Sequence, residues 1–221
     1  VQRRYGDGPG VRPLYLLLAA SQVFLATQAT AWGPKAHRAV VVAATRACPG
    51  EIGQKLRERL PLVLAACNRP DEWRGASRLS RAGGLPDHYV NLEAISRSPA
   101  KAEFPEDRYS LLLQIRKPPA EIGFLPYAIV ENHDRLKVAL TDASENPAAW
   151  DEAAVWVGIL SHFVADATMP LHTTVYYDGR PRWGRLGGPV ECRGIHERLE
   201  MKVAEPLAGA LPPLPAGAGP K

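Results

Sequence analysis

The sequence has few cysteines, and none lies in the arrangement that a thiolate metal site requires. Cys48, Cys67 and Cys192 are its three cysteines, and no C-x-x-C pair exists. A metal site built on thiolates is therefore disfavoured. In an oxidising compartment Cys48 and Cys67 could form a disulfide that leaves Cys192 free, and three unpaired thiols are the alternative.

The chain also lacks a strong excess of charge. Its formal net charge is +4, and three arginines and one aspartate within residues 1–31 account for about half of that. So small a charge does not by itself indicate nucleic-acid binding. The length of 221 residues and the 46% hydrophobic content fit one domain with a sizeable core.

Long stretches of period-two alternation, hairpin signals and internal repeats are missing as well, so strands are not favoured. Helical patterns are plentiful, and a long loop is expected from residue 68 to about 105, around the Gly83-Gly84 and Leu85-Pro86 breaks. We therefore expect an all-α protein, a single compact domain of about six or seven helices. The expected helices span residues 36–46, 51–66, 108–117, 123–141, 147–169 and 190–206.

No apolar run reaches the roughly 20 residues that a membrane-spanning helix needs. The longest, Leu14–Ala26, follows three arginines and precedes the small residues Ala29-Thr30-Ala31. This order is typical of a cleaved secretory signal peptide, and an uncleaved anchor is the alternative. We expect a signal peptide over 1–31, a functional domain over 32–206, and a disordered Pro/Ala/Gly-rich tail over 207–221. The product would be secreted or periplasmic, with no stable membrane insertion.

Cleavage after Ala31 would make Trp32 the first residue. A free α-amino group and the carbonyl oxygen of the same residue can chelate a metal ion, whereas an acylated nitrogen is a very poor ligand. The processing site is therefore part of the functional hypothesis.

Histidines and carboxylates recur at helical spacing in the second half of the chain. His162 and Asp166 are four residues apart, as are His196 and Glu200, so each pair shares one helix face and could hold one metal. His172 follows a proline break and could face a second metal. With His37 only five residues after the expected N-terminus, the pattern indicates a hydrolytic zinc site, because zinc takes His and carboxylate ligands.

Three stretches resemble the zinc-dependent nucleases of the S-one/P-one type, which share a fold with the bacterial zinc-dependent phospholipases C. Trp32-Gly33-Pro34-Lys35-Ala36-His37 resembles the mature N-terminus of these nucleases. The run His162–His172 resembles their H-F-x-x-D-x-x-x-P-L-H motif, and Asp71-Glu72-Trp73-Arg74 matches their D-E-x-R stretch. The resemblance implies the fold of that superfamily.

The resemblance also implies three zinc ions, with Asp166 bridging two of them. The implied ligands are Asp71, His88, His162 and Asp166 for the first ion, His172, His196 and Glu200 for the second, and His37, Asp166 and the Trp32 amino nitrogen and carbonyl oxygen for the third.

A fourth stretch, His88-Tyr89-Val90-Asn91, resembles the family's H-F-x-D. The substrate contacts follow from the same resemblance. Arg74 inherits the role of contacting the phosphate, which suits a planar guanidinium. Tyr89 would stack on a nucleobase and Asn91, which replaces the family's acid, would hydrogen-bond its edge. Asp71, Arg74 and Asp166 are the expected catalytic residues.

These residues predict a monomeric phosphodiesterase that cleaves single-stranded DNA or RNA to 5′-phosphorylated products. A phospholipase C acting on phosphatidylcholine-like lipids is the nearest alternative, since the nucleases tend to end their ligand set with Asp where this chain has Glu200. A non-catalytic zinc-binding envelope protein is the third interpretation.

Overall fold

The computed structural model describes residues 32–181 and 190–208. The expected signal peptide lies outside these residues, as does the tail from residue 209 onward. None of the helices in the described ranges has both the length and the hydropathy that crossing a bilayer requires.

The described residues are mostly helical, which confirms the expectation of an all-α protein. They form more helical segments than the six or seven expected. The α-helices are α1 (Pro34–Ala47), α2 (Gly50–Glu58), α3 (Leu60–Ala66), α4 (Arg69–Ala76), α5 (Arg78–Gly84), α6 (Leu92–Ile95), α7 (Arg108–Ile115), α8 (Pro119–Ile122), α9 (Leu125–Glu145), α10 (Trp150–Ala167), α11 (Ile195–Glu197) and α12 (Glu205–Ala208). The 3-10 turns are η1 (Leu85–His88), η2 (Pro99–Lys101), η3 (Pro147–Ala149) and η4 (Pro170–Thr173), and a π-helix, η6, spans Arg198–Ala204.

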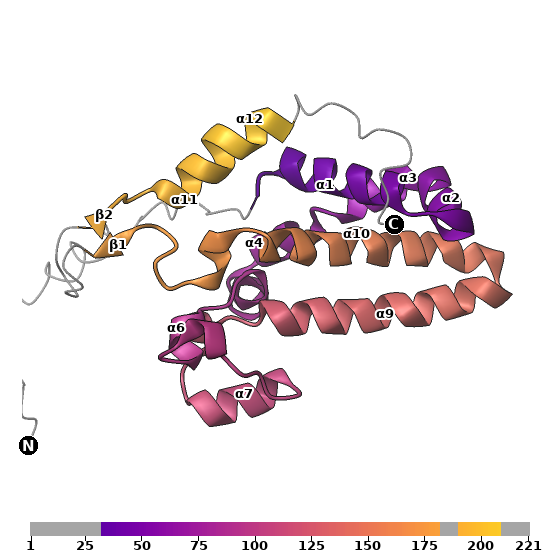
Figure 1. Ribbon diagram of the computed structural model, residues 1–221. Coiled ribbons are helices and arrows are strands. Elements are labelled where there is room, and N and C mark those ends of the chain that lie inside the picture. Colours follow the sequence, from indigo (N-terminus) through magenta and orange to yellow (C-terminus); the bar gives the residue numbers. More distant parts are fainter. Residues whose placement is uncertain (1–31, 182–189, 209–221) are drawn as a thin grey trace, which may run out of the picture.

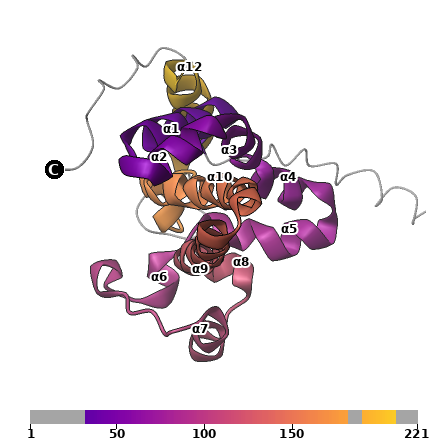
Figure 2. The same ribbon diagram turned by 90° about the vertical axis from the view of Figure 1, so that its right-hand side faces the viewer.

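Helix α10 is the central element of the fold. It runs antiparallel to α9 on one side and packs against α1 and α3 on the other (Figure 1). Seen end-on, α1, α2 and α3 cover one flank of α10 while α9 covers the opposite flank, with α4 and α5 to one side (Figure 2). The C-terminal half of α10 also contacts α4, η1 and η4, so chain segments from all over the sequence meet there.

Two apolar clusters hold α10 in place. One joins Ala66 of α3 and Leu125 of α9 to Ile159 and Phe163 of α10. The other joins α1, α2 and α3 to Ala154. Because α10 is clamped from both sides, the polar residues that it carries near its C-terminal end have fixed positions.

The expectation of one helix over 51–66 is wrong at Pro61. Proline lacks the amide hydrogen that the helix would need and its ring obstructs the preceding turn. The chain breaks at Arg59, where φ is −107° and ψ is 17°, and Pro61 then occupies the first turn of α3. The two short helices α2 and α3 replace the single one expected.

The expectation of a long loop over 68–105 is also wrong. Pro70 lies in the first turn of α4, and Ser77 caps α5 by accepting a hydrogen bond from the Ser80 amide at 3.0 Å. Both are ordinary helix-start signals. The Leu85-Pro86 break begins η1 instead of a loop.

The helix expected over 190–206 begins later than predicted. Val190–Glu191 is the short strand β2, which pairs antiparallel with β1 (Arg180–Pro181). Gly194, with φ of 76°, then leads into α11. From there the helix continues through η6 into α12.

Substituting Gly158 should test the close packing of α10 on α3. A Cβ there would clash with the Val63 carbonyl oxygen and lie 2.8 Å from Ala66 Cβ. Gly158→Ala should therefore lower the free energy of unfolding by about 1–3 kcal/mol, measured by urea denaturation. Gly83→Ala, which meets nothing within 4 Å, is the matched control and should be neutral or stabilising. Equal denaturation midpoints for the two variants would contradict the packing account.

Candidate metal centre

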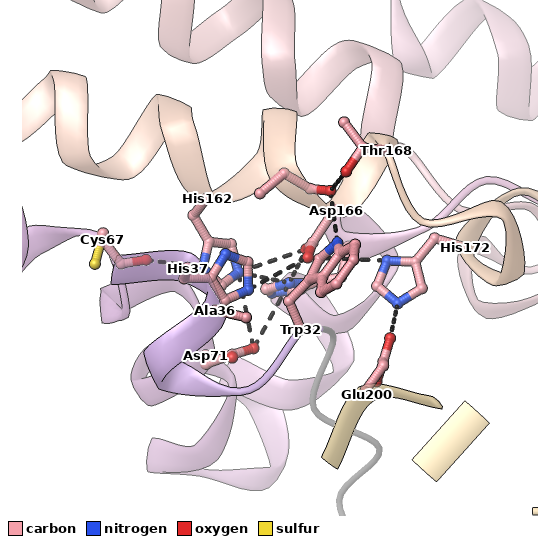
Figure 3. Close-up of polar contacts among 12 residues, drawn as sticks. Trp32, Ala36, His37, Cys67, Asp71, His162, Asp166, Thr168, His172 and Glu200 are labelled. Carbon is pink, nitrogen blue, oxygen red and sulfur yellow. Dashed lines mark hydrogen bonds and ion pairs between the residues drawn. The ribbon is translucent and has the colours of Figure 1, made fainter. Parts of the chain in front are cut away.

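Five of the six histidines converge at the C-terminal end of α10, and all five are buried. Two carboxylates, Asp166 and Glu200, are buried among them, and Asp71 is half-buried beside them (Figure 3). The sixth histidine, His133, is exposed on α9. The converging histidines are His37, His88, His162, His172 and His196.

One group of ligand atoms surrounds Oδ2 of Asp166. His88 Nδ1 lies 3.0 Å from this oxygen and His162 Nε2 lies 3.5 Å from it. The two ring nitrogens are 3.1 Å apart, and Asp71 Oδ1 is 3.7 Å from the first and 3.8 Å from the second. Two imidazole nitrogens that face each other at this distance need a shared proton or a cation between them.

A second group lies at the other oxygen of the same carboxylate. His37 Nε2 is 3.5 Å from Asp166 Oδ1, and the His37 ring stacks on that of His162 with centroids 4.0 Å apart. Trp32 lies beside the group, where its indole Nε1 donates to the Ala165 carbonyl oxygen at 2.9 Å (Figure 3). The two oxygens of Asp166 thus face two different groups, which is the geometry of a bridging carboxylate.

A third group is formed by His172, His196 and Glu200. The two Nε2 atoms are 3.1 Å apart, and Glu200 Oε1 lies 3.1 Å from that of His172 and 2.8 Å from that of His196. His172 Nδ1 is 3.9 Å from Asp166 Oδ1, so this group adjoins the other two. Three sets of ligand atoms could each hold a metal ion: His37 with His162 and Asp166, Asp71 with His88 and His162, and His172 with His196 and Glu200. His162 belongs to both of the first two sets.

Local structure explains how the third group is positioned. Met169 has an extended backbone before Pro170, so α10 ends and η4 turns His172 back towards the site. The Val90 amide donates to the His172 carbonyl oxygen at 2.8 Å and fixes the turn. Glu200 lies in the π-helix η6, an irregularity frequent at functional sites.

The backbone of α3 orients the central histidine. His162 Nδ1 lies 2.8 Å from the carbonyl oxygen of Cys67, so the tautomer that donates there leaves Nε2 free to act as a ligand. Such an outer hydrogen bond is the usual accompaniment of a metal-binding imidazole. Cys67 itself is buried and, like Cys48 and Cys192, a free thiol.

Burial shifts the ionisation of the five residues around the Asp166 carboxylate (His37, His88, His162, Asp71 and Asp166 itself) towards their uncharged forms. It lowers the pKa of His37 to about 3 and holds the pKa values of His88 and His162 well below the usual value. Burial also raises the pKa of Asp71 to about 6, and burial together with the neighbouring Asp71 raises the pKa of Asp166. The imidazoles of His37, His88 and His162 are thus neutral near pH 7, as metal ligands must be.

Several buried polar atoms of these groups lack any hydrogen-bond partner among the described residues: both ring nitrogens of His37, Oδ1 of Asp166 and Oε2 of Glu200. Leaving a buried polar atom unpaired costs about 1–3 kcal/mol, and more if it is charged. Two of these atoms, His37 Nε2 and Asp166 Oδ1, lie 3.5 Å apart, and a cation held between them would satisfy both.

The expected phosphate contact lies beside the site. The Arg74 side chain is buried, and its Nη2 is 2.6 Å from Asp71 Oδ1. Arg74 and Asp71 both belong to α4, one turn apart, so the guanidinium is fixed next to a candidate ligand.

Tyr89 and Asn91, the two expected base contacts, hydrogen-bond through their polar groups to backbone carbonyl oxygens of α8. Tyr89 donates its hydroxyl hydrogen to the Ala120 carbonyl oxygen at 2.8 Å, and burial raises the pKa of Tyr89 to about 12. Asn91 donates from its amide to the Glu121 carbonyl oxygen at 3.0 Å. Only the partly exposed ring of Tyr89 is then available to a substrate, and base reading by Asn91 would need this bond to break.

Sequence reasoning missed one aromatic residue at the site. The Tyr177 ring contacts His196 edge-to-face with centroids 5.5 Å apart, and 49% of Tyr177 is exposed. Tyr177 follows the candidate ligand His172 by only five residues, and this closeness in the sequence could have suggested that it lies at the site.

In comparisons with known proteins, no family model, curated protein or solved structure matches the chain significantly.

Proton competition predicts how metal affinity depends on pH. Because the pKa of Asp71 is raised to about 6, this carboxyl is increasingly protonated as the pH falls further, and metal binding must then displace its proton. The apparent affinity for Zn²⁺ should fall about fivefold between pH 6 and pH 5, and the fall should approach about tenfold per unit at lower pH. Competitive titration against a chromophoric chelator between about pH 5 and 7.5 measures it. An affinity independent of pH would contradict the assignment of Asp71 as a ligand.

Proposed function

We propose that the protein is a three-zinc phosphodiester hydrolase, most consistent with a nuclease for single-stranded DNA or RNA. One observation carries this proposal: three groups of buried His and carboxylate ligands are contiguous around the single carboxylate of Asp166. A structural metal site needs only one group of ligands, whereas phosphodiester hydrolysis benefits from several adjacent metals.

The ligand chemistry and spacing suit zinc. The donors are imidazole nitrogens and carboxylate oxygens, and tetrahedral ligands about 2.0–2.1 Å from zinc lie roughly 3.3 Å apart. The separations within the third group are 2.8–3.1 Å and those around Asp166 Oδ2 are 3.0–3.8 Å. Asp71, His88, His162 and Asp166 would hold the first ion, His172, His196 and Glu200 the second, and Trp32, His37 and Asp166 the third.

Bound zinc would supply a water of lowered pKa and positive charge for the phosphate oxygens. The chain's own contribution is to fix the ligands and the substrate. Asp166 would hold two ions at a set separation, and Arg74 would place its guanidinium against a phosphoryl oxygen, where charge grows in the transition state. The aspartate beside Arg74 would orient it, so Asp71 and Arg74 act as a pair.

Two observations bear on the substrate. Arg74 next to the first ligand group and the partly exposed Tyr89 favour a nucleic acid, because a guanidinium suits a phosphate and an aromatic ring suits a base. The last ligand in the sequence is Glu200, where the nucleases tend to have Asp, and this difference favours the alternative of a phospholipase C acting on phosphatidylcholine-like lipids. In this proposal residues 1–31 are removed on export, the enzyme is secreted or periplasmic, and it acts as a monomer.

Cleavage of single-stranded DNA with and without a zinc chelator tests the proposal, with phosphatidylcholine vesicles as the parallel substrate. We expect cleavage of DNA to 5′-phosphorylated fragments that chelation abolishes and added zinc restores. Lipid cleavage alone would keep the metal centre and replace the nuclease by the phospholipase. A zinc-loaded protein inert towards both would favour the non-catalytic zinc-binding protein.

The N-terminal ligand makes a separate prediction. A free Trp32 amine can chelate a metal, whereas a peptide nitrogen cannot do so effectively. Adding one alanine before Trp32 should therefore reduce zinc content by one ion and lower the rate of DNA cleavage by at least about tenfold. The matched control is an alanine appended at the C-terminus, which should change neither quantity. Undiminished turnover and zinc content in the N-terminally extended protein would refute this role.

A further inference from the structure

The continuous helix formed by α11, η6 and α12 (residues 195–208) is called the C-terminal arm. The side chain of Glu205 joins this arm to the start of α1. Its Oε1 accepts a hydrogen bond from the Lys35 amide at 3.1 Å, and its Oε2 accepts from the amides of Lys35 at 3.0 Å and Ala36 at 3.1 Å. These are amides that the first turn of a helix leaves unpaired, and a carboxylate is favoured there by the helix dipole. Gly33, the N-cap residue, has no side chain to fill this role.

The space occupied by the Glu205 carboxylate exists because residue 33 is glycine. A Cβ on Gly33 would clash with the Glu205 carboxylate and lie 2.9 Å from its Cγ. The Gly33 backbone has φ of −58°, which any residue can adopt, so the requirement is for space and not for an unusual backbone conformation.

Two anchors therefore hold the segment that contains Trp32 and leads to His37. The Trp32 indole is tied to the Ala165 carbonyl oxygen of α10, next to Asp166. The Glu205 carboxylate ties the following turn to the C-terminal arm. Between the two anchors, the backbone of Trp32 has little freedom to move away from the Asp166 side of the site.

The π-helix explains how one helical arm reaches both places. At 3.6 residues per turn, a residue five positions along an α-helix is rotated by about 140° from the first. In η6 the Glu205 amide donates to the Glu200 carbonyl oxygen, a five-residue hydrogen bond that brings Glu205 back towards the face of Glu200. Glu200 can thus contact His172 and His196 while Glu205 reaches α1.

We propose that Glu205 is a positioning residue for the metal site formed by Trp32, His37 and Asp166, and that it couples that site to the one formed by His172, His196 and Glu200. The inference rests on the proposed metal centre. Glu205 is not a metal ligand; it acts by fixing the backbone that presents the N-terminal ligands. An ordinary helix cap would stabilise α1 without any selective effect on one metal ion.

Zinc titration of Glu205→Gln separates these roles. The protein is produced from its full sequence and its first residue is read by mass spectrometry, so that processing is known. We expect one of three zinc ions to bind roughly tenfold more weakly, with the other two retained. Gly33→Ala, which displaces the same carboxylate from the opposite side, should give the same selective loss. Glu197→Gln, an exposed carboxylate on the same arm, is the control and should bind all three ions normally.

Each outcome bears on a different claim. If the unaltered protein binds three ions and both variants bind them with unchanged affinity, the positioning role is wrong while the metal centre stands. An equal loss of all three ions, with a lower denaturation midpoint in the metal-free protein, would also overturn it in favour of a simple cap. If the unaltered protein binds no zinc, the proposed function fails and this inference fails with it.

Discussion

The carboxylate of Asp166 is the group on which the site depends. It is fully buried, one of its oxygens faces His88 and His162, and the other faces His37. An anion in such surroundings is stable only when cations or hydrogen-bond donors compensate for the lost water. The two oxygens of Asp166 lie 3.0–3.9 Å from ring nitrogens of His37, His88, His162 and His172. The imidazoles of His37, His88 and His162 are neutral because they are buried, so they add no positive charge. Metal cations would compensate for the water that the Asp166 carboxylate has lost.

The packing of the helices around α10 holds this carboxylate in place. Helix α10 carries both His162 and Asp166, and it is packed between α9 and the pair α1 and α3. Apolar contacts fix its position, the Cys67 carbonyl oxygen fixes the His162 ring, and the proline break after Met169 returns His172 to the same end of the helix. The C-terminal arm then closes the site through Glu200.

The sequence predicted best what a single helix encodes. The pairs His162–Asp166 and His196–Glu200 could be found from a four-residue spacing, because both partners of each pair lie on one helical face. Asp71 and His88 have no such partner, and only the family resemblance suggested them. Pro70 and Ser77 are residue types that favour helix starts, and the expectation of a loop over residues 68–105 overlooked them. The π-helix and the contact of Glu205 with α1 depend on tertiary packing, which local sequence patterns do not encode.

Metal binding by the buried groups around Asp166 can be tested by diffraction from crystals of the zinc-loaded protein, recorded on both sides of the zinc absorption edge. We expect anomalous peaks at the three ligand groups, with two of the peaks flanking the Asp166 carboxylate. A well-ordered structure without anomalous density there, in which protons or waters satisfy the histidines and carboxylates, would contradict it.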